Sequence, residues 1–363
     1  MQTLGKISLI NDTDTSPIEG SSQKPIWLLN PAADLLFICG GMLWLIVLLS
    51  QCLSPLSMQL NSPQLGLLLL GAYVFSEPHF GASFMRAHSR GVKKSAFVAI
   101  ALFGGLIVLT LASSSAITAL TCKIYMLTVI AHYALQSLYV VRCYVGRSPN
   151  RPSAKLDLVL SLVMILPAAV QIFFLLAHPS SNSSQFLGLE MPIWPAWPTW
   201  PVQLCAILWC AAVVVSFAFL AKGWLQAKMV VPIPALLLIL TNSVLFYFSL
   251  SLPVSQLWIY VPAFLHGAQS IALGPFSNGY LSQASQGHTS DTNGLDHSRA
   301  NTNDRPCRLS FYMSSLLIGL VIMYVIPNLL NSVGFDSKLT YPAVLIGVSL
   351  FHFVSEMRNP FLN

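Results

Sequence analysis

Long apolar runs recur along this chain from residue 33 almost to its last residues. Ten of them approach the length of about 20 residues that an α-helix needs to cross a bilayer. The expected spanning helices are 33–53, 64–85, 95–114, 123–145, 156–177, 202–221, 234–252, 254–273, 309–330 and 340–357. Only 8% of the 363 side chains are charged and 55% are hydrophobic, whereas soluble domains average about 25% charged residues. The sequence therefore predicts an all-α, polytopic membrane protein with a single helical domain over residues 33–363.

The distribution of positive charge predicts how these helices are oriented, because Lys and Arg concentrate in cytoplasmic loops. With ten helices and a cytoplasmic N-terminus, all but two of the 18 Lys and Arg residues fall on internal segments or helix ends. The two exceptions are Lys123 and Lys338. An error of one helix would scramble this split, so we expect both termini in the cytoplasm, with residues 1–32 forming a polar cytoplasmic segment.

Two predicted loops differ in character. The external loop 178–201 has three tryptophans interleaved with prolines and contains no Lys or Arg. This pattern is typical of an aromatic belt at the outer membrane interface, and a small lid over an outer opening is the alternative. The internal loop 277–308 is rich in Ser, Asn, Asp and Gly, and we expect it to be disordered.

Four histidines interrupt the apolar runs. An ionisable side chain at the centre of a spanning helix costs at least about 2.5 kcal/mol and commonly marks a functional site. His79, His132, His266 and His352 all lie on even-numbered predicted helices, which run from outside to inside. At a rise of 1.5 Å per residue, three fall in the cytoplasmic half of the bilayer and His132 at or near its edge. We therefore expect the four side chains to converge on one site.

Polar residues follow three of these histidines by about one helical turn, a spacing that places both side chains on one face. The pairs are His132 with Gln136, His266 with Gln269, and His352 with Glu356. A metal-bound imidazole needs an acceptor for its second ring nitrogen. The three polar residues are therefore candidates for orienting the histidines.

The consecutive residues Glu77, Pro78 and His79 form the most unusual stretch of the second predicted helix. Glu77 and His79 lie about 200° apart around a regular helix, and Pro78 should distort the helix because it lacks an N–H group and clashes with the preceding turn. We expect His79 to face the site and Glu77 to face a neighbouring helix or a buried cation. Arg86 should lie on the His79 face near the inner rim, and Gly81 should allow close helix approach.

Asp34 lies at the inner end of the first predicted helix. It is either a helix-start acid stabilised by the helix dipole or a further carboxylate that reaches the histidine site. Acids at helix starts are common, which favours the first interpretation.

Neutral imidazoles suit iron, zinc, copper and nickel, and four of them near a carboxylate would hold one ion or a close pair. We favour such a metal site. A single haem with axial histidines, a proton or metal-ion relay in a transporter, and an assembly factor whose histidines only bridge helices stay open. The sequence lacks the GxxxxGK[ST], GxGxxG and GxSxG motifs, and no nucleic-acid partner is expected.

Histidines spread over several membrane helices, without the HxxxH and HxxHH boxes of integral di-iron desaturases, resemble the bacterial Brp/Blh family of β-carotene cleavage dioxygenases. The resemblance implies a helical membrane enzyme that holds non-haem iron with four histidines. In this chain they would be His79, His132, His266 and His352. It also implies a lipophilic, carotenoid- or isoprenoid-like substrate that enters from the membrane lipids.

Overall fold

The computed structural model describes most of the chain in separate stretches. These are 27–45, 48, 72–89, 94–148, 152–179, 185–186, 189–226, 231–251, 262–273 and 308–357. The predicted polar N-terminal segment falls almost entirely outside the described residues, and so does nearly all of the predicted internal loop 277–308. Both stay predictions.

Helices make up nearly all of the described chain. They are α1 (Pro31–Ala33), α4 (Glu77–Ser89), α5 (Lys94–Ala112), α6 (Ser115–Val145), α7 (Ala154–Ala177), α8 (Trp200–Leu225), α9 (Ile233–Ser251), a helix over 262–273, α11 (Arg308–Leu320), α12 (Ile326–Ser332) and α13 (Ser337–Met357). Three π-helical turns adjoin them: η1 (Asp34–Ile38), η2 (Ala72–Ser76) and η4 (Val321–Val325). The short strands β1 (Gln185–Phe186) and β2 (Leu189–Glu190) form an antiparallel pair. The all-α prediction is confirmed, apart from this two-stranded pair.

Four of the described helical stretches are long and apolar enough to cross a membrane. They are Ser115–Val145, Ala154–Ala177, Trp200–Leu225 and Leu309–Ser332. Their outer faces carry bulky apolar side chains, and Val214 and Phe217 on α8 are each 68% exposed. Soluble monomers seldom expose large apolar patches, so these faces fit contact with lipid. The four helices support membrane association, whereas ten spans and cytoplasmic termini stay predictions.

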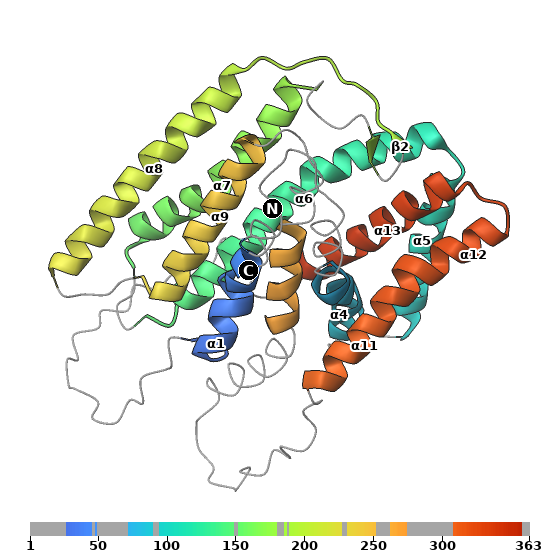
Figure 1. Cartoon of the computed structure of the whole chain (residues 1–363), viewed down its shortest axis with the longest axis horizontal. Coiled ribbons are helices and arrows are strands. Elements are labelled where there is room, and N and C mark those ends of the chain that lie inside the picture. The colour runs from blue at the N-terminus through green and yellow to red at the C-terminus, as the bar shows by residue number, and fades with distance from the viewer. Residues whose placement is uncertain are drawn as a thin grey trace, which may run out of the picture.

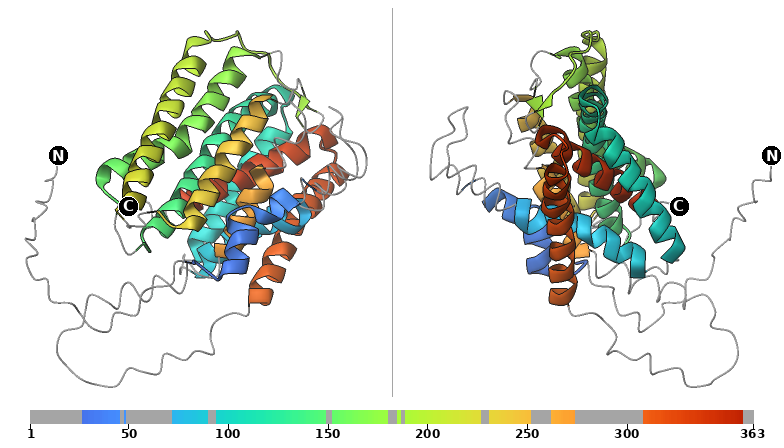
Figure 2. Two further views of the ribbon diagram at one scale, coloured as in Figure 1. Left: turned by 60° about the vertical axis from the view of Figure 1, so that its left-hand side comes forward. Right: turned by 90° about the vertical axis from the view of Figure 1, so that its right-hand side faces the viewer.

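The long helix α6 occupies the middle of the bundle. Figure 1 places α7, α8 and α9 on one side of it, and α4, α5, α11, α12 and α13 on the other. The contacts agree, because α6 packs directly against α5, α7, α9 and α13. The further views in Figure 2 show the same division. Because of this position, α6 can bring side chains from both halves of the molecule together.

Helix α6 begins eight residues before the predicted position at 123. The Ser114 side chain accepts a hydrogen bond from the Ile117 amide at 3.4 Å and caps the helix there. Serine is favoured at this position because its oxygen satisfies an amide that has no partner within the helix. As a result, Lys123 lies about two turns inside α6 instead of at its end.

The first predicted helix is interrupted, which is a correction to the continuous span 33–53. The turn η1 ends at Ile38, and Gly40 has a φ angle of 89°, which a helix cannot accommodate. Side chains from other helices satisfy the exposed carbonyls: Gln269 Nε2 donates to Ile38 O at 3.0 Å, and Thr241 Oγ1 donates to Cys39 O at 2.8 Å. Such substitutes are needed wherever a helix breaks inside a membrane protein.

Pro78 also disturbs its helix, as expected. The π-helical turn η2 ends at Ser76, directly before Glu77 and Pro78. In a regular helix the amide of residue 78 would pair with the Val74 carbonyl, but proline has no N–H group. Tyr312 of α11 donates its hydroxyl to that carbonyl at 2.8 Å instead. The carbonyl that Pro78 leaves without an amide partner therefore connects α11 to the segment that carries His79.

Glycines allow the helices around His79 to touch through their backbones. A Cβ atom on Gly81 would clash with the Ser315 carbonyl, and one on Gly319 would clash with the Glu77 carbonyl. In the same way, a Cβ atom on Gly267, next to His266, would clash with the Phe75 carbonyl. Small residues allow this close packing of membrane helices, and here they draw the helices that carry His79 and His266 together.

Candidate metal centre

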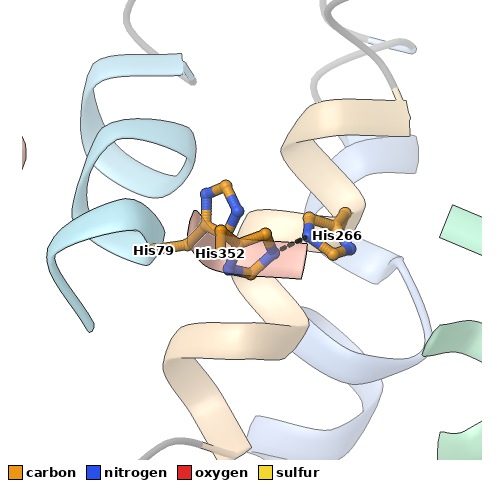
Figure 3. A group of neighbouring side chains, drawn as sticks. All are labelled: His79, His266 and His352. Atoms are coloured by element: carbon orange, nitrogen blue, oxygen red, sulfur yellow. Dashed lines mark hydrogen bonds between the residues drawn. The ribbon is translucent and has the colours of Figure 1, made fainter. Parts of the chain in front are cut away.

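The structure brings the four predicted histidines together from four different helices. His79 lies on α4, His132 on α6, His266 on 262–273 and His352 on α13. Figure 3 shows His79, His266 and His352 turned toward one another, with a dashed contact between His266 and His352. These three residues are at most 4% exposed, whereas His132 is partly exposed.

The Nε2 atoms of three histidines form a nearly equilateral triangle. His132 Nε2 lies 3.1 Å from His352 Nε2 and 3.3 Å from His266 Nε2, and the last two atoms are 3.3 Å apart. His79 completes the cluster: one ring nitrogen from each of His79, His266 and His352 lies within 4.8 Å of the others. His266 and His352 therefore belong both to the triangle with His132 and to the group with His79.

Hydrogen bonds define which nitrogen of two rings can act as a ligand. His79 Nδ1 lies 2.6 Å from the Ser76 carbonyl, which only accepts, so Nδ1 carries the hydrogen. The Ser83 hydroxyl donates to the His79 carbonyl at 3.2 Å and therefore accepts from His352 Nδ1 at 2.6 Å. In a neutral imidazole the lone pair then lies on Nε2. Both rings have the tautomer that a metal ligand requires.

The spacing of the Nε2 atoms fits a single bound ion. For metal–nitrogen bonds of about 2.0–2.1 Å, ligand nitrogens lie about 2.9 Å apart at octahedral angles and about 3.4 Å apart at tetrahedral angles. The observed distances of 3.1–3.3 Å fall between these values. The lone pair of His352 lies on Nε2, whereas the roles of His132 and His266 in these contacts depend on their tautomers. A central cation would bind all three atoms in the tautomer that places the lone pair on Nε2. The buried histidines can therefore hold a metal ion.

The same spacing disfavours the haem interpretation. Axial imidazoles bind haem iron from opposite faces of the macrocycle. No planar macrocycle fits between Nε2 atoms that are 3.1–3.3 Å apart.

The two glutamines predicted to orient the imidazoles form hydrogen bonds with backbone carbonyls, with each other and with Ser270. Gln136 Nε2 donates to the His266 carbonyl at 3.1 Å and to Gln269 Oε1 at 3.4 Å. Ser270 Oγ donates to Gln136 Oε1 at 3.2 Å, while Gln269 donates to the Ile38 carbonyl. These bonds connect the 262–273 helix to α6 and η1. The glutamines thus position the helix that carries His266.

The carboxylates of Glu77 and Asp34 accept hydrogen bonds from groups other than the histidine rings. Glu77 Oε1 accepts from the Tyr324 hydroxyl of η4 at 3.2 Å, so Glu77 faces a neighbouring helix. Asp34 is fully buried and accepts from the amides of Leu28 and Leu29 at 2.7 and 3.0 Å. It holds the segment before α1 in place. Asn30 is the N-cap of α1, and Asp34 is the acidic residue in the first turn of η1, in agreement with the interpretation as a helix-start acid.

The side chains of Arg86 and Glu356 lie outside the described part of the structure. Their backbones belong to α4 and α13, respectively. Their expected roles beside His79 and His352 stay predictions.

Sequence reasoning missed residues that complete the site. Ser83 follows His79 by four residues, a spacing that could have identified it. Three aromatic rings lie against the cluster: between ring centroids, Phe80 is 4.3 Å from His79, Phe353 is 4.2 Å from His132 and Tyr133 is 4.7 Å from His266. Each ring adjoins a histidine in the sequence, so no helical spacing marked it in advance.

Ser83 provides a direct test of how His352 is oriented. We expect Ser83→Ala to weaken metal affinity about 10- to 100-fold, the usual cost of losing an acceptor behind a metal-bound imidazole. Affinity can be measured by competition with a chelator. Ser113→Ala is the matched control, because Ser113 Oγ donates only to the Leu109 carbonyl on α5. Equal affinity of the Ser83→Ala variant and the unaltered protein would contradict this role.

The comparisons with known proteins leave the site as the main evidence for function. No protein-family model, curated protein or solved structure matches this chain.

Proposed function

We propose that this chain is a membrane-embedded metalloenzyme that holds non-haem iron and uses dioxygen to oxidise a lipophilic substrate. His79, His132, His266 and His352 would hold the ion. The observation that carries the proposal is the convergence of three Nε2 atoms at 3.1–3.3 Å inside an apolar helical bundle.

Iron is favoured among the metals that neutral imidazoles suit because the resemblance to Brp/Blh dioxygenases implies it. Bound iron would supply the redox chemistry that dioxygen activation requires. The carotenoid- or isoprenoid-like substrate class rests on the same resemblance and on the apolar helices, which would admit such a molecule from the bilayer.

The chain's own residues would orient the ligands and exclude water. Ser76 and Ser83 hold the rings of His79 and His352 through their Nδ1 atoms. Phe353 and Tyr133 cover the rings of His132 and His266. A shielded site of this kind limits side reactions of an oxidising centre with water.

A small cavity beside His266 could admit a small molecule to the centre. It measures about 20 Å³ and is lined by polar and apolar side chains. They are Tyr133, Ser137, Gln171, Asn242, Leu245, Pro262, Leu265 and His266. A cavity of this size has room for about one water-sized molecule that polar partners can hold, and α6, α7, α9 and 262–273 enclose it.

A transporter of protons or metal ions is the second candidate. The interruption of the first helix at Cys39 and Gly40 favours it, because transporters often build ion sites at broken helices. An assembly factor, the third candidate, would need no bound metal.

The test is an oxygen-uptake assay on the protein in lipid nanodiscs after loading with iron(II). Carotenoids and other lipids are supplied under air and under argon, and products are separated by chromatography. We expect uptake and product to require both iron and oxygen, and a His132→Ala/His266→Ala variant to give neither. Bound iron without uptake for any lipid would contradict the oxygenase and favour the transporter.

A further inference from the structure

Lys123 is a buried cation that the metal centre does not use. It lies on α6, and the whole residue is only 7% exposed. Its Nζ atom lies 5.8 Å from the centroid of the Trp194 ring. The side chain lines a hollow with Met126 and Leu127 of α6, Leu175 and Leu176 of α7, Pro179 and Trp194. Apart from Lys123, this hollow is almost entirely apolar.

No carboxylate neutralises this lysine among the residues that the structure describes. Within the described residues, the ion pair is formed by Arg142 and Asp157, whose Nη2 and Oδ2 atoms lie 3.0 Å apart. Removing an ammonium group from water is costly unless an opposite charge accompanies it, and a cation–π contact offsets only part of that cost. The hollow measures only about 10 Å³, so it cannot enclose a ligand. An unneutralised cation at its mouth, next to apolar side chains, is complementary to an anion that carries hydrocarbon.

The surroundings resemble the interfacial layer of a membrane. The Trp/Pro segment that covers Lys123 also exposes Ile193, Trp197 and Trp200 by 50–73%, and tryptophans gather at the depth of lipid headgroups. Lys123 precedes His132 by nine residues, which is about 13–14 Å along a helix. The hollow is therefore a site separate from the metal centre.

We propose that Lys123 binds the anionic headgroup of a membrane lipid. The phosphate would pair with Nζ at the mouth of the hollow beside the Trp194 ring. An acyl chain would lie outside the hollow along Leu120, Ile124 and Leu127 of α6, because Met126, Leu175 and Leu176 are at most 9% exposed. Charge complementarity selects this occupant over a neutral lipid. The site does not depend on iron or on the proposed oxygenase activity.

The experiment is native mass spectrometry of the full chain with mixed phosphatidylglycerol and phosphatidylcholine. We expect an approximately fivefold preference for phosphatidylglycerol, which is the usual effect of one lysine near a membrane surface. Lys123→Met should lower the preference about fivefold relative to the unaltered protein, and Lys123→Arg should retain it. Lys338→Met is the matched control, because Lys338 is exposed. Since Lys123→Met removes a buried charge, the variant should fold at least as stably as the unaltered protein.

An equal preference in the Lys123→Met and Lys338→Met variants would overturn the proposal. An excess of inorganic phosphate distinguishes the two sources of the anion. Failure of free phosphate to displace the lipid supports a lipid site, whereas displacement that depends on Lys123 would show a site for soluble anions and would also overturn it.

Discussion

Replacing both His132 and His266 with alanine is expected to abolish metal binding. The change removes two of the three Nε2 atoms that lie 3.1–3.3 Å apart and leaves His79 and His352 as the remaining imidazoles. The loss in affinity should exceed the 10- to 100-fold that follows from losing a residue behind a ligand. The measurement is the metal-to-protein ratio after loading with iron(II) and removal of unbound ions.

His178→Ala is the matched control for this variant. His178 is the C-cap residue of α7, where its Nδ1 lies 3.1 Å from the Phe174 carbonyl. The control should bind as much metal as the unaltered protein. Full metal content in the His132→Ala/His266→Ala variant would contradict the proposed ligand set.

Gly81→Ala is expected to destabilise the bundle and to weaken metal binding at the same time. The new methyl group would clash with the Ser315 carbonyl, and backbone cannot move aside as a flexible side chain can. Overpacking of this kind typically costs about 1–3 kcal/mol. Because Gly81 lies two residues after His79 on α4, any shift of that helix also displaces a ligand. Thermal unfolding in detergent and iron content measure the two effects.

Gly105→Ala is the control because it makes the same chemical change inside α5, where nothing lies within 4 Å of the new methyl group. Alanine is about 1 kcal/mol more favourable than glycine in a helix interior, so this variant should be as stable as the unaltered protein or more so. If Gly81→Ala matched Gly105→Ala in both measurements, the close contact of α4 with α11 would not support the site.

The sequence predicted the histidine cluster because depth along a helix depends only on residue count. Residue counts predict a similar depth for His79, His132, His266 and His352, and the structure brings the four side chains together. Their partners depend on how each helix is rotated and how closely it approaches its neighbours. Spacing on one helix suggested Gln136 and Gln269 as partners of the rings, but in the structure both contact backbone.

Contacts between distant parts of the chain explain the interruption of the first predicted helix. Hydropathy predicted a continuous helix through Gly40, because the apolar run continues there. The positive φ angle of Gly40 depends on Gln269 and Thr241, which lie more than 200 residues away and satisfy the released carbonyls. Long-range compensation of this kind leaves no pattern in the local sequence. Ser114 is a typical N-cap residue, but the helix start was predicted from hydropathy alone, which placed it at residue 123.

Elemental analysis with an optical spectrum of the protein purified in detergent tests the central claim most directly. The proposal predicts about one equivalent of iron for each chain and no Soret band. Absence of any bound metal, in protein that is folded and was purified without chelators, would contradict the metal centre.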